Sequence, residues 1–233
     1  MTQLKAVIFG AIGVIAETSD LQRQSFNAAF AEAGLDWVWD AETYRTLLSV
    51  NGGQNRLRAY RDADPARADV SDALIATIHE RKTAHYATII AGGGLAPRAG
   101  VVALMATCKA AGVMTALCTS TSRANVDAIA DGLAGQLDFA DFASITTIDK
   151  IAAVKPAPDA YLHCLGALGL TADEVTAIED TPVSMASART AGIAVIATPG
   201  AMTADQDFSD AALVVSDLNA VTLATIEALL AQS

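Results

Sequence analysis

Near its N-terminus the chain reads Val7-Ile8-Phe9-Gly10-Ala11-Ile12-Gly13, an apolar run that ends in a turn bracketed by two glycines. Short apolar runs that contain β-branched residues and stop at a glycine are typical of buried parallel strands. We therefore predict a strand over residues 4–9, followed by a loop. That loop offers no side chain able to act as a nucleophile, an acid or a metal ligand, because it consists of glycine, alanine and isoleucine.

Strand and helix patterns alternate from residue 98 to the C-terminal end. This alternation is typical of a parallel sheet with helices on both faces. Residues 19–93 show helical patterns only, including a long one over residues 70–90. The sequence thus predicts a doubly wound, Rossmann-like α/β core with an inserted α-helical cap. The expected domain limits are residues 1–16 plus 94–233 for the core and 17–93 for the cap, and the further core strands are expected at 113–118, 143–148, 175–178, 193–197 and from Leu213.

The composition limits the classes of partner that we expect for the protein. The 233 residues are 52% hydrophobic and carry a formal net charge of -11 without a cluster of lysine or arginine. Because each phosphate contact of a polyanion binder needs a cation, we expect neither nucleic acid nor an anionic membrane as a partner. The apolar run at residues 6–16 is too short to span a bilayer and contains two glycines, so we interpret it as part of the fold rather than as a leader. We expect a cytoplasmic monomer.

Polar side chains follow the later strands at the points where these strands end. Thr119 comes after the second strand, Lys155 after the third, and Glu179-Asp180 after the fourth. Ligands collect at the carboxyl ends of the strands in open α/β sheets, so these residues should converge with Gly10. Each of them alone has a simpler explanation, namely a helix cap, a solvated lysine or a charge pair at a helix N-terminus. Together they predict a site for phosphate and a metal.

Four motifs in this order resemble the haloacid dehalogenase superfamily over essentially the whole chain. That family has an Asp-x-Asp-Gly loop after the first strand, then a Ser/Thr, a Lys before a helix, and paired acids after the fourth strand. Further segments are similar to the CbbY-type sugar bisphosphate phosphatases, relatives of β-phosphoglucomutase. The motif segments here are Gly10-Ala11-Ile12-Gly13, Thr119, Lys155-Pro156-Ala157-Pro158-Asp159 and Ile178-Glu179-Asp180-Thr181-Pro182, and the CbbY-like segments include Phe26-Asn27-Ala28-Ala29-Phe30, Gly34-Leu35-Asp36-Trp37 and Gly52-Gly53.

The resemblance implies a mechanism whose two central groups are missing. In the family the first aspartate of the loop attacks phosphorus, and the second protonates the leaving oxygen. The corresponding residues here are Gly10 and Ile12, and neither can do this chemistry. Removal of a covalent nucleophile costs about 10⁶ in turnover. We therefore predict that ordinary phosphatase activity is lost, and that binding of phosphate or of a small phosphorylated metabolite such as a phosphosugar remains.

The resemblance also assigns roles to other residues. It implies substrate or phosphate contacts at Thr119, Ser120, Lys155 and Glu17, and a Mg²⁺ site at Glu179 and Asp180. Metal affinity should be weakened rather than abolished, because the carboxylate at position 10 is lost while the backbone carbonyl of residue 12 remains. The cap departs from the CbbY pattern as well, since Gln22 and Gln54 replace a histidine and a lysine. This difference weakens the expectation of bisphosphate specificity.

Three other functions are compatible with part of the sequence. An enzyme of another type would use a different carboxylate of the cleft, such as Glu17 or Asp180. In a non-catalytic protein that binds a partner, the site at the strand ends would neither bind a ligand nor catalyse a reaction. The spacing Gly10-x-x-Gly13-x-x-Ala16 faintly resembles a dinucleotide-binding turn, but that turn requires a second strand ending in an acid about 20 residues later, where this chain is helical.

Overall fold

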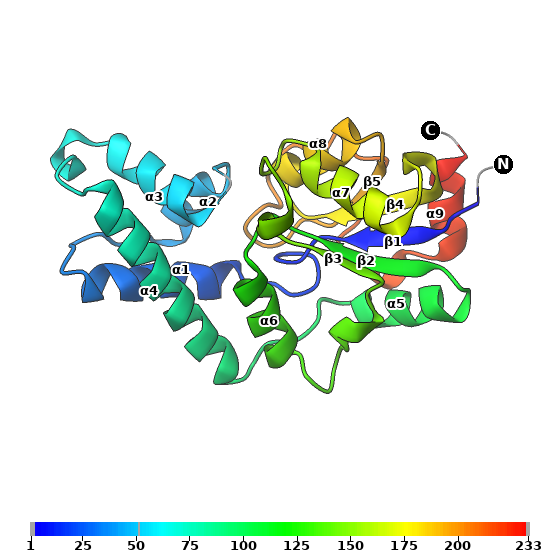
Figure 1. Ribbon diagram of the computed structural model, residues 1–233, viewed down its shortest axis with the longest axis horizontal. Helices are drawn as coiled ribbons and strands as arrows, with labels where there is room; N and C mark the ends of the chain where they lie inside the picture. The colour runs from blue at the N-terminus through cyan, green and yellow to red at the C-terminus, as the bar shows by residue number, and fades with distance from the viewer. Residues whose placement is uncertain (1–2, 51, 232–233) are drawn as a thin grey trace. The chain divides into compact units, whose positions relative to one another are not determined.

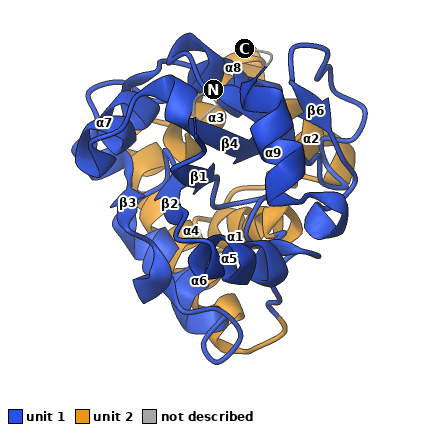
Figure 2. Cartoon of the chain, turned by 90° about the vertical axis from the view of Figure 1, so that its right-hand side faces the viewer, with its two compact units in different colours: residues 1–17, 95–233 blue, residues 18–94 orange. Residues whose placement is uncertain are grey.

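Two compact units make up the computed structural model, which describes residues 3–50 and 52–231. The core unit joins residues 1–17 to residues 95–233, and the cap unit is the continuous stretch 18–94 (Figure 2). The chain therefore leaves the core unit after its first strand, forms the 77 residues of the cap unit, and then returns to the core unit.

In the described part of the chain, a parallel sheet of six strands forms the middle of the core unit (Figure 1). The order across the sheet is β3-β2-β1-β4-β5-β6, which confirms the predicted doubly wound α/β class. The strand order changes direction between β1 and β4, and ligand sites form beyond the carboxyl ends of the strands at such a point. The strands are β1 (Ala6–Phe9), β2 (Met114–Cys118), β3 (Ser144–Thr146), β4 (Val175–Glu179), β5 (Ala194–Ala197) and β6 (Leu213–Val214).

The register of β1 fixes which residues meet at this point. Phe9 pairs with Leu117 of β2 on one side and with Ile178 of β4 on the other. Gly10 therefore follows β1 at the level where Glu179 ends β4. All residues of β1 and β4 are buried, as expected for strands covered on both faces.

Helices cover both faces of the sheet (Figure 1). Helices α7 and α8 pack on the face formed by Ala6, Ile8 and Cys118, where Tyr161, Cys164 and Met185 fill the core. Helices α5 and α6 lie on the opposite side in Figure 1. The α-helices of this unit are α5 (Val101–Ala110), α6 (Arg123–Gly132), α7 (Asp159–Leu168), α8 (Pro182–Thr190) and α9 (Leu223–Leu230), and its short 3₁₀ helices are Phe139–Asp141, Ile148–Lys150, Ala172–Glu174 and Leu218–Ala220.

Two elements of the core unit are shorter than their sequence patterns predict. The helix expected from Arg98 begins at Val101, because Gly100 before it holds a left-handed φ of 85° and serves as the N-cap. The strand expected over residues 143–148 is reduced to three residues at the edge of the sheet. An edge strand pairs with one neighbour only, so fewer of its residues are fixed by hydrogen bonds.

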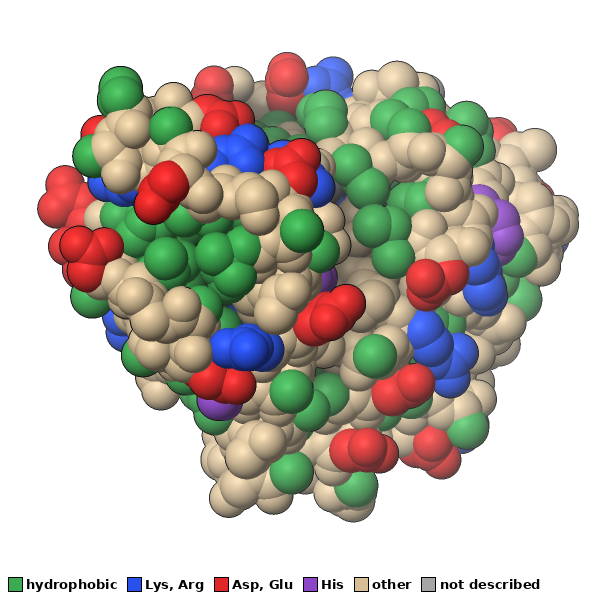
Figure 3. All heavy atoms as spheres, turned by 60° about the vertical axis from the view of Figure 1, so that its left-hand side comes forward, with side chains coloured by type: hydrophobic (Ala, Val, Ile, Leu, Met, Phe, Trp, Pro, Cys, Tyr) green, Lys and Arg blue, Asp and Glu red, His purple; other side chains and the backbone are tan. Residues whose placement is uncertain are grey.

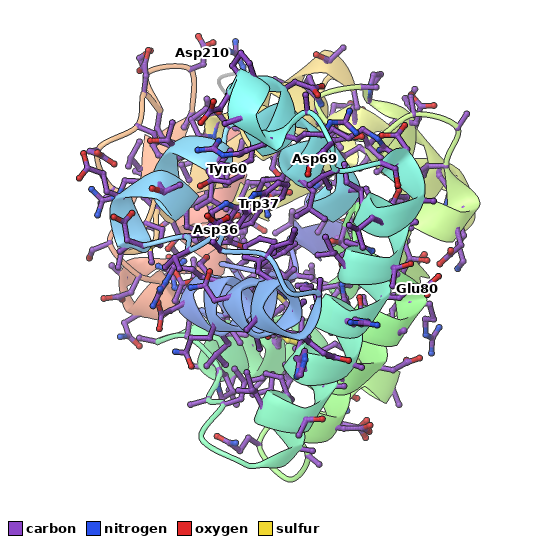
Figure 4. The ribbon with its side chains drawn as sticks, turned by 90° about the vertical axis from the view of Figure 1, so that its left-hand side faces the viewer. Asp36, Trp37, Tyr60, Asp69, Glu80 and Asp210 are labelled. Carbon is purple, nitrogen blue, oxygen red and sulfur yellow. The ribbon has the colours of Figure 1, made fainter. Side chains whose placement is uncertain are left out.

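The cap unit is helical, and its core is aromatic. Rings of Phe26 and Phe30 lie 4.6 and 4.9 Å from the ring of Trp39, centroid to centroid. Trp37 meets Tyr60 edge to face at 5.2 Å, and Figure 4 shows these two side chains next to each other. Large rings of this kind each bury a large apolar area, and aliphatic residues such as Leu57, Ile75 and Ile78 complete the core. Its helices are α1 (Ser19–Glu32), α2 (Ala41–Leu47), α3 (Gly53–Asp62), α4 (Asp72–Ala91) and the 3₁₀ helix Pro65–Arg67.

The surface carries charges of both signs. Acidic and basic side chains lie interspersed on the face shown in Figure 3. Arg61, for example, bridges Asp62 and Asp72 with N–O distances of 2.7 Å to each. Among the residues that the structure describes, no helix is both long and apolar enough to cross a membrane.

Candidate active site

The loop after β1 packs closely against the end of β4. The backbone N–H of Gly10 donates to the carbonyl of Ile178 at 2.9 Å. A Cβ placed on Gly10 would lie 2.6 Å from Oε2 of Glu179 and 2.8 Å from Cγ2 of Val14. Both distances are shorter than carbon atoms tolerate, so a side chain at position 10 requires Glu179 and Val14 to move. The neighbouring Ile12 is half-buried and offers only an alkyl side chain.

Lys155 is a buried cation of this site, with 3% of its surface exposed. Its Nζ donates to the carbonyl of Cys118 at 3.1 Å, to Oε1 of Glu179, and to the hydroxyl of Tyr161 at 3.5 Å. Burial lowers the pKa of the Lys155 amine, but the surrounding acidic groups, Glu179 first among them, together outweigh this effect, and the pKa lies above its ordinary value. The ammonium form is therefore kept throughout the neutral range.

Tyr161 belongs to the same cluster, although the sequence reasoning did not single it out. It lies on α7, is fully buried, and donates its hydroxyl hydrogen to Oε1 of Glu179. Burial and the negative charge of Glu179 raise the pKa of this phenol well above its ordinary value, so it remains a donor. Its position six residues after Lys155 follows no motif. The one available signal was an aromatic residue in the first turn of the helix after the lysine.

Thr119 and Ser120 lie at the end of β2, in the turn before α6. The hydroxyl oxygen of Thr119 accepts a hydrogen bond from the backbone N–H of Thr121 at 3.1 Å. The hydroxyl oxygen of Ser120 accepts one from the backbone N–H of Lys155 at 3.2 Å. Each hydroxyl thus uses an oxygen lone pair within the protein, and its O–H can still donate to another group.

Asp180 follows β4 and lies against the loop at Gly13. Gly13 has a φ of 78°, and a Cβ at this position would overlap Oδ2 of Asp180, so the loop requires glycine here. Burial is the main reason why the pKa of Asp180 lies well above its usual range, and repulsion by Glu179 and Glu17 adds to it. Such a buried carboxyl is stabilised by any cation that reaches it.

Arg98 ties the loop of β1 to neighbouring loops of the core unit, and the sequence reasoning did not single it out either. Its guanidinium donates to the carbonyls of Gly13, of Thr198 at 2.6 Å and of Pro199 at 3.0 Å, and its backbone N–H donates to the carbonyl of Ile15 at 2.8 Å. No sequence pattern marks this residue, because its partners are backbone carbonyls that any residue supplies.

The structure therefore brings several of the residues named from the sequence together. Gly10, Lys155 and Glu179 form one contact set, and Ser120 touches the main chain of Lys155. Glu17 is not part of this contact set. Its carboxylate lies against Gly200, and its charge acts on Asp180.

The chemistry of the donors is compatible with Mg²⁺. Glu179 and Asp180 supply two adjacent carboxylates, and Mg²⁺ is commonly held by one or two carboxylates, with waters and phosphate oxygens completing its shell. Within the described residues, no group of three or more His, Cys, Asp or Glu side chains could hold a metal ion. These two adjacent carboxylates are oxygen ligands of the kind that Mg²⁺ accepts.

Comparison with known proteins assigns the family. A model of the haloacid dehalogenase-like hydrolases matches residues 4–192. The chain belongs to the haloacid dehalogenase-like hydrolase family. Protein CbbY of Rhodobacter capsulatus is 42% identical over 224 residues, which cover 96% of this chain and 98% of that protein. The predicted resemblance to CbbY-type members of the family is thereby confirmed.

Two crystal structures of CbbY from Rhodobacter sphaeroides are similar throughout. One, in complex with phosphate, has a TM-score of 0.89 and 33% identity, and the match covers 97% of this chain and 100% of that one. The other, an aspartate-to-asparagine variant in complex with xylulose-(1,5)bisphosphate, has a TM-score of 0.85 and 34% identity, with 93% and 95% covered. This haloacid dehalogenase-like chain is thus similar over nearly its whole length to proteins whose crystal structures hold phosphate or a sugar bisphosphate.

Proposed function

We propose that this chain binds inorganic phosphate or the phosphate group of a sugar phosphate at the carboxyl end of its sheet, without ordinary phosphatase turnover. The observation that carries the proposal is the loop after β1. Gly10 has no side chain, the space above it is taken by Glu179 and Val14, and Ile12 has no acidic group. A covalent attack on phosphorus from this loop therefore has no nucleophile.

The remaining groups support anion binding. Thr119 and Ser120 present hydroxyl groups at the end of β2, and the ammonium of Lys155 donates to the carbonyl of Cys118, the last residue of the same strand. Charge-assisted hydrogen bonds of this kind are the strong ones in phosphate sites. The phosphate complex of a CbbY relative that is similar over 97% of this chain is in keeping with this ligand class.

Glu179 and Asp180 are the residues that would hold a Mg²⁺ ion. Bound there, Mg²⁺ supplies positive charge that offsets the charge of a phosphate. The protein's own part is to bind and orient the anion, since neither loop position can transfer a proton to a leaving oxygen.

Binding and turnover are tested separately. Melting temperature is measured with inorganic phosphate and a panel of sugar phosphates and bisphosphates up to millimolar concentration, with MgCl₂ present. Phosphate release is measured on the same panel. Stabilisation by phosphate compounds without phosphate release supports the proposal. Release by the natural protein contradicts it and would favour another carboxylate, such as Glu17 or Asp180, and the absence of any stabilisation contradicts it too.

Three variants sharpen this experiment. Lys155→Met should lose the stabilisation by phosphate, whereas Lys109→Met, at a lysine whose side chain is 71% exposed, should keep it. Turnover should appear in the combined variant Gly10→Asp, Ile12→Asp, Val14→Ala, in which the third change makes room for the new side chain at position 10.

A further inference from the structure

The ammonium of Lys155 is fully engaged inside the protein. An ammonium has three N–H donors. Three acceptors already surround Nζ, namely the carbonyl of Cys118, Oε1 of Glu179 and the hydroxyl of Tyr161. A phosphate can gain a direct hydrogen bond from Lys155 only if one of these partners gives way.

Glu179 is the partner that an anion would have to displace. Its Oε1 accepts hydrogen bonds from both Lys155 and Tyr161. Its Oε2 points to the space above Gly10, 2.6 Å from where a Cβ would begin. The carboxylate thus fills the space that a residue with a side chain at position 10 would use, and it neutralises the lysine from there.

The charges nearby leave no surplus for an incoming anion. Asp180 lies within electrostatic reach of Glu179, Glu17, Lys155 and Arg98, so three carboxyl groups face two cations. Arg98 is already bound to backbone carbonyls. An incoming phosphate therefore meets no uncompensated positive charge until a cation is added or a carboxylate is withdrawn.

We propose that Glu179 is a built-in competitor of the phosphate for Lys155, and that a divalent cation bound at Glu179 and Asp180 relieves this competition by drawing the carboxylate away from the lysine. Tyr161 is then a positioning residue, which holds Glu179 on Lys155 when no cation is bound. The inference rests on the proposed function, because it concerns the regulation of the same anion site. It predicts that divalent cation and phosphate bind with positive coupling, which must be reciprocal.

Isothermal titration with inorganic phosphate, with and without MgCl₂, tests the competition. For the natural protein we expect Mg²⁺ to tighten phosphate binding by about 5- to 150-fold, the usual range of such couplings. For Glu179→Gln we expect phosphate to bind in the absence of Mg²⁺ at least about tenfold more tightly than to the natural protein, and Mg²⁺ to add little. If Glu179 served only as a metal ligand or a structural residue, the variant would bind phosphate equally well or less well in the absence of Mg²⁺.

A second variant serves if Glu179→Gln does not fold. Tyr161→Phe keeps the ring and removes one of the two hydrogen bonds that hold Oε1 of Glu179. It should raise the affinity for phosphate without Mg²⁺ and reduce the gain from Mg²⁺. Tyr86→Phe is the matched control, because Tyr86 is an equally buried tyrosine of the cap unit whose hydroxyl faces Thr18 and Gln22 rather than Glu179.

Different results would contradict the competition by Glu179 and the anion site itself. If the natural protein binds phosphate without Mg²⁺ as tightly as the folded Glu179 and Tyr161 variants do, the competition is wrong and the proposed anion site stands. If no protein binds phosphate under either condition, the proposed function is wrong and the competition with it. Enhanced binding by both variants, with Tyr86→Phe unchanged, supports both.

Discussion

Lys82 of α4 lies buried in the cap unit in surroundings that disfavour its charge. It is 3% exposed, its Nζ donates to the side-chain carbonyl of Gln22, and it lies 5.2 and 5.0 Å from the ring centroids of Phe26 and Tyr86. Burial first, and then the charge of Arg56, lower the pKa of this amine from 10.5 to about 7. We predict that replacing Lys82 by methionine removes a pH dependence from the stability of the cap unit.

The magnitude follows from proton linkage. The unfolded chain keeps the Lys82 proton up to a pKa of 10.5, whereas the folded chain releases it at about 7. Between these values the unfolded state binds more protons, so the free energy of unfolding rises with pH. The full span is about 5 kcal/mol, at 1.36 kcal/mol for each of 3.5 units, and about 2 kcal/mol of it falls between pH 7 and pH 9. Lys82→Met should lack this rise.

Urea unfolding followed by tryptophan fluorescence measures the stability of the cap unit at each pH. The chain has two tryptophans, Trp37 and Trp39, and both belong to the core of the cap unit. From pH 7 to pH 9, the unfolding free energy of the natural protein should rise by about 2 kcal/mol relative to that of Lys82→Met. Lys109→Met, at an exposed lysine of the core unit, is the control and should show no such trend. A difference that stays constant within about 0.5 kcal/mol between the two pH values would refute the reasoning.

Two further predictions concern the core unit. Gly10→Asp should lower the free energy of unfolding by about 1–3 kcal/mol, the usual cost of overpacking. Adding Val14→Ala should recover part of this loss, because Cγ2 of Val14 stands 2.8 Å from the new Cβ. Urea unfolding followed by circular dichroism measures both effects, and a Gly10→Asp protein as stable as the natural one would contradict the crowding at position 10. Burial raises the pKa of the Cys118 thiol far above its usual range and that of Cys164 to about 11. A thiol reagent at pH 8 should therefore label these two residues only as fast as the protein unfolds, and labelling within seconds in the native state would count against this.

Apolar patterns were sufficient to predict the class of fold. The runs at residues 7–9 and 175–178 lie next to each other in the sheet, and both are covered on two faces, which is why every residue of each run is buried rather than every second one. Element ends were less predictable. The helix expected from Arg98 starts three residues later because Gly100 adopts a left-handed conformation, which glycine permits but does not require.

The site could be predicted at the level of the strand ends but not at the level of contacts. Parallel strands bring their carboxyl ends to one edge, so topology alone explains why Lys155 and Glu179 lie close to Gly10. The hydrogen bond from Tyr161 to Glu179 depends on the packing of α7 against the sheet and on side-chain rotamers, and no spacing in the sequence encodes it. The same holds for Arg98, whose partners are backbone carbonyls.

The central position of β1 in the sheet has a consequence for folding during synthesis on the ribosome. Ala6 pairs with Met114 and with Val175, so its second neighbour is synthesised 169 residues later, as 175 − 6 shows. At about 5–20 residues per second, this strand waits roughly 8–34 s for that neighbour. Meanwhile residues 18–94 leave the ribosome as one uninterrupted unit with an aromatic core of its own, which can close during the delay. Until β2 is made, the nascent chain thus carries a helical unit with its own core and an unpaired, wholly apolar strand at the same time, and one edge of that strand stays without its native partner until β4 follows.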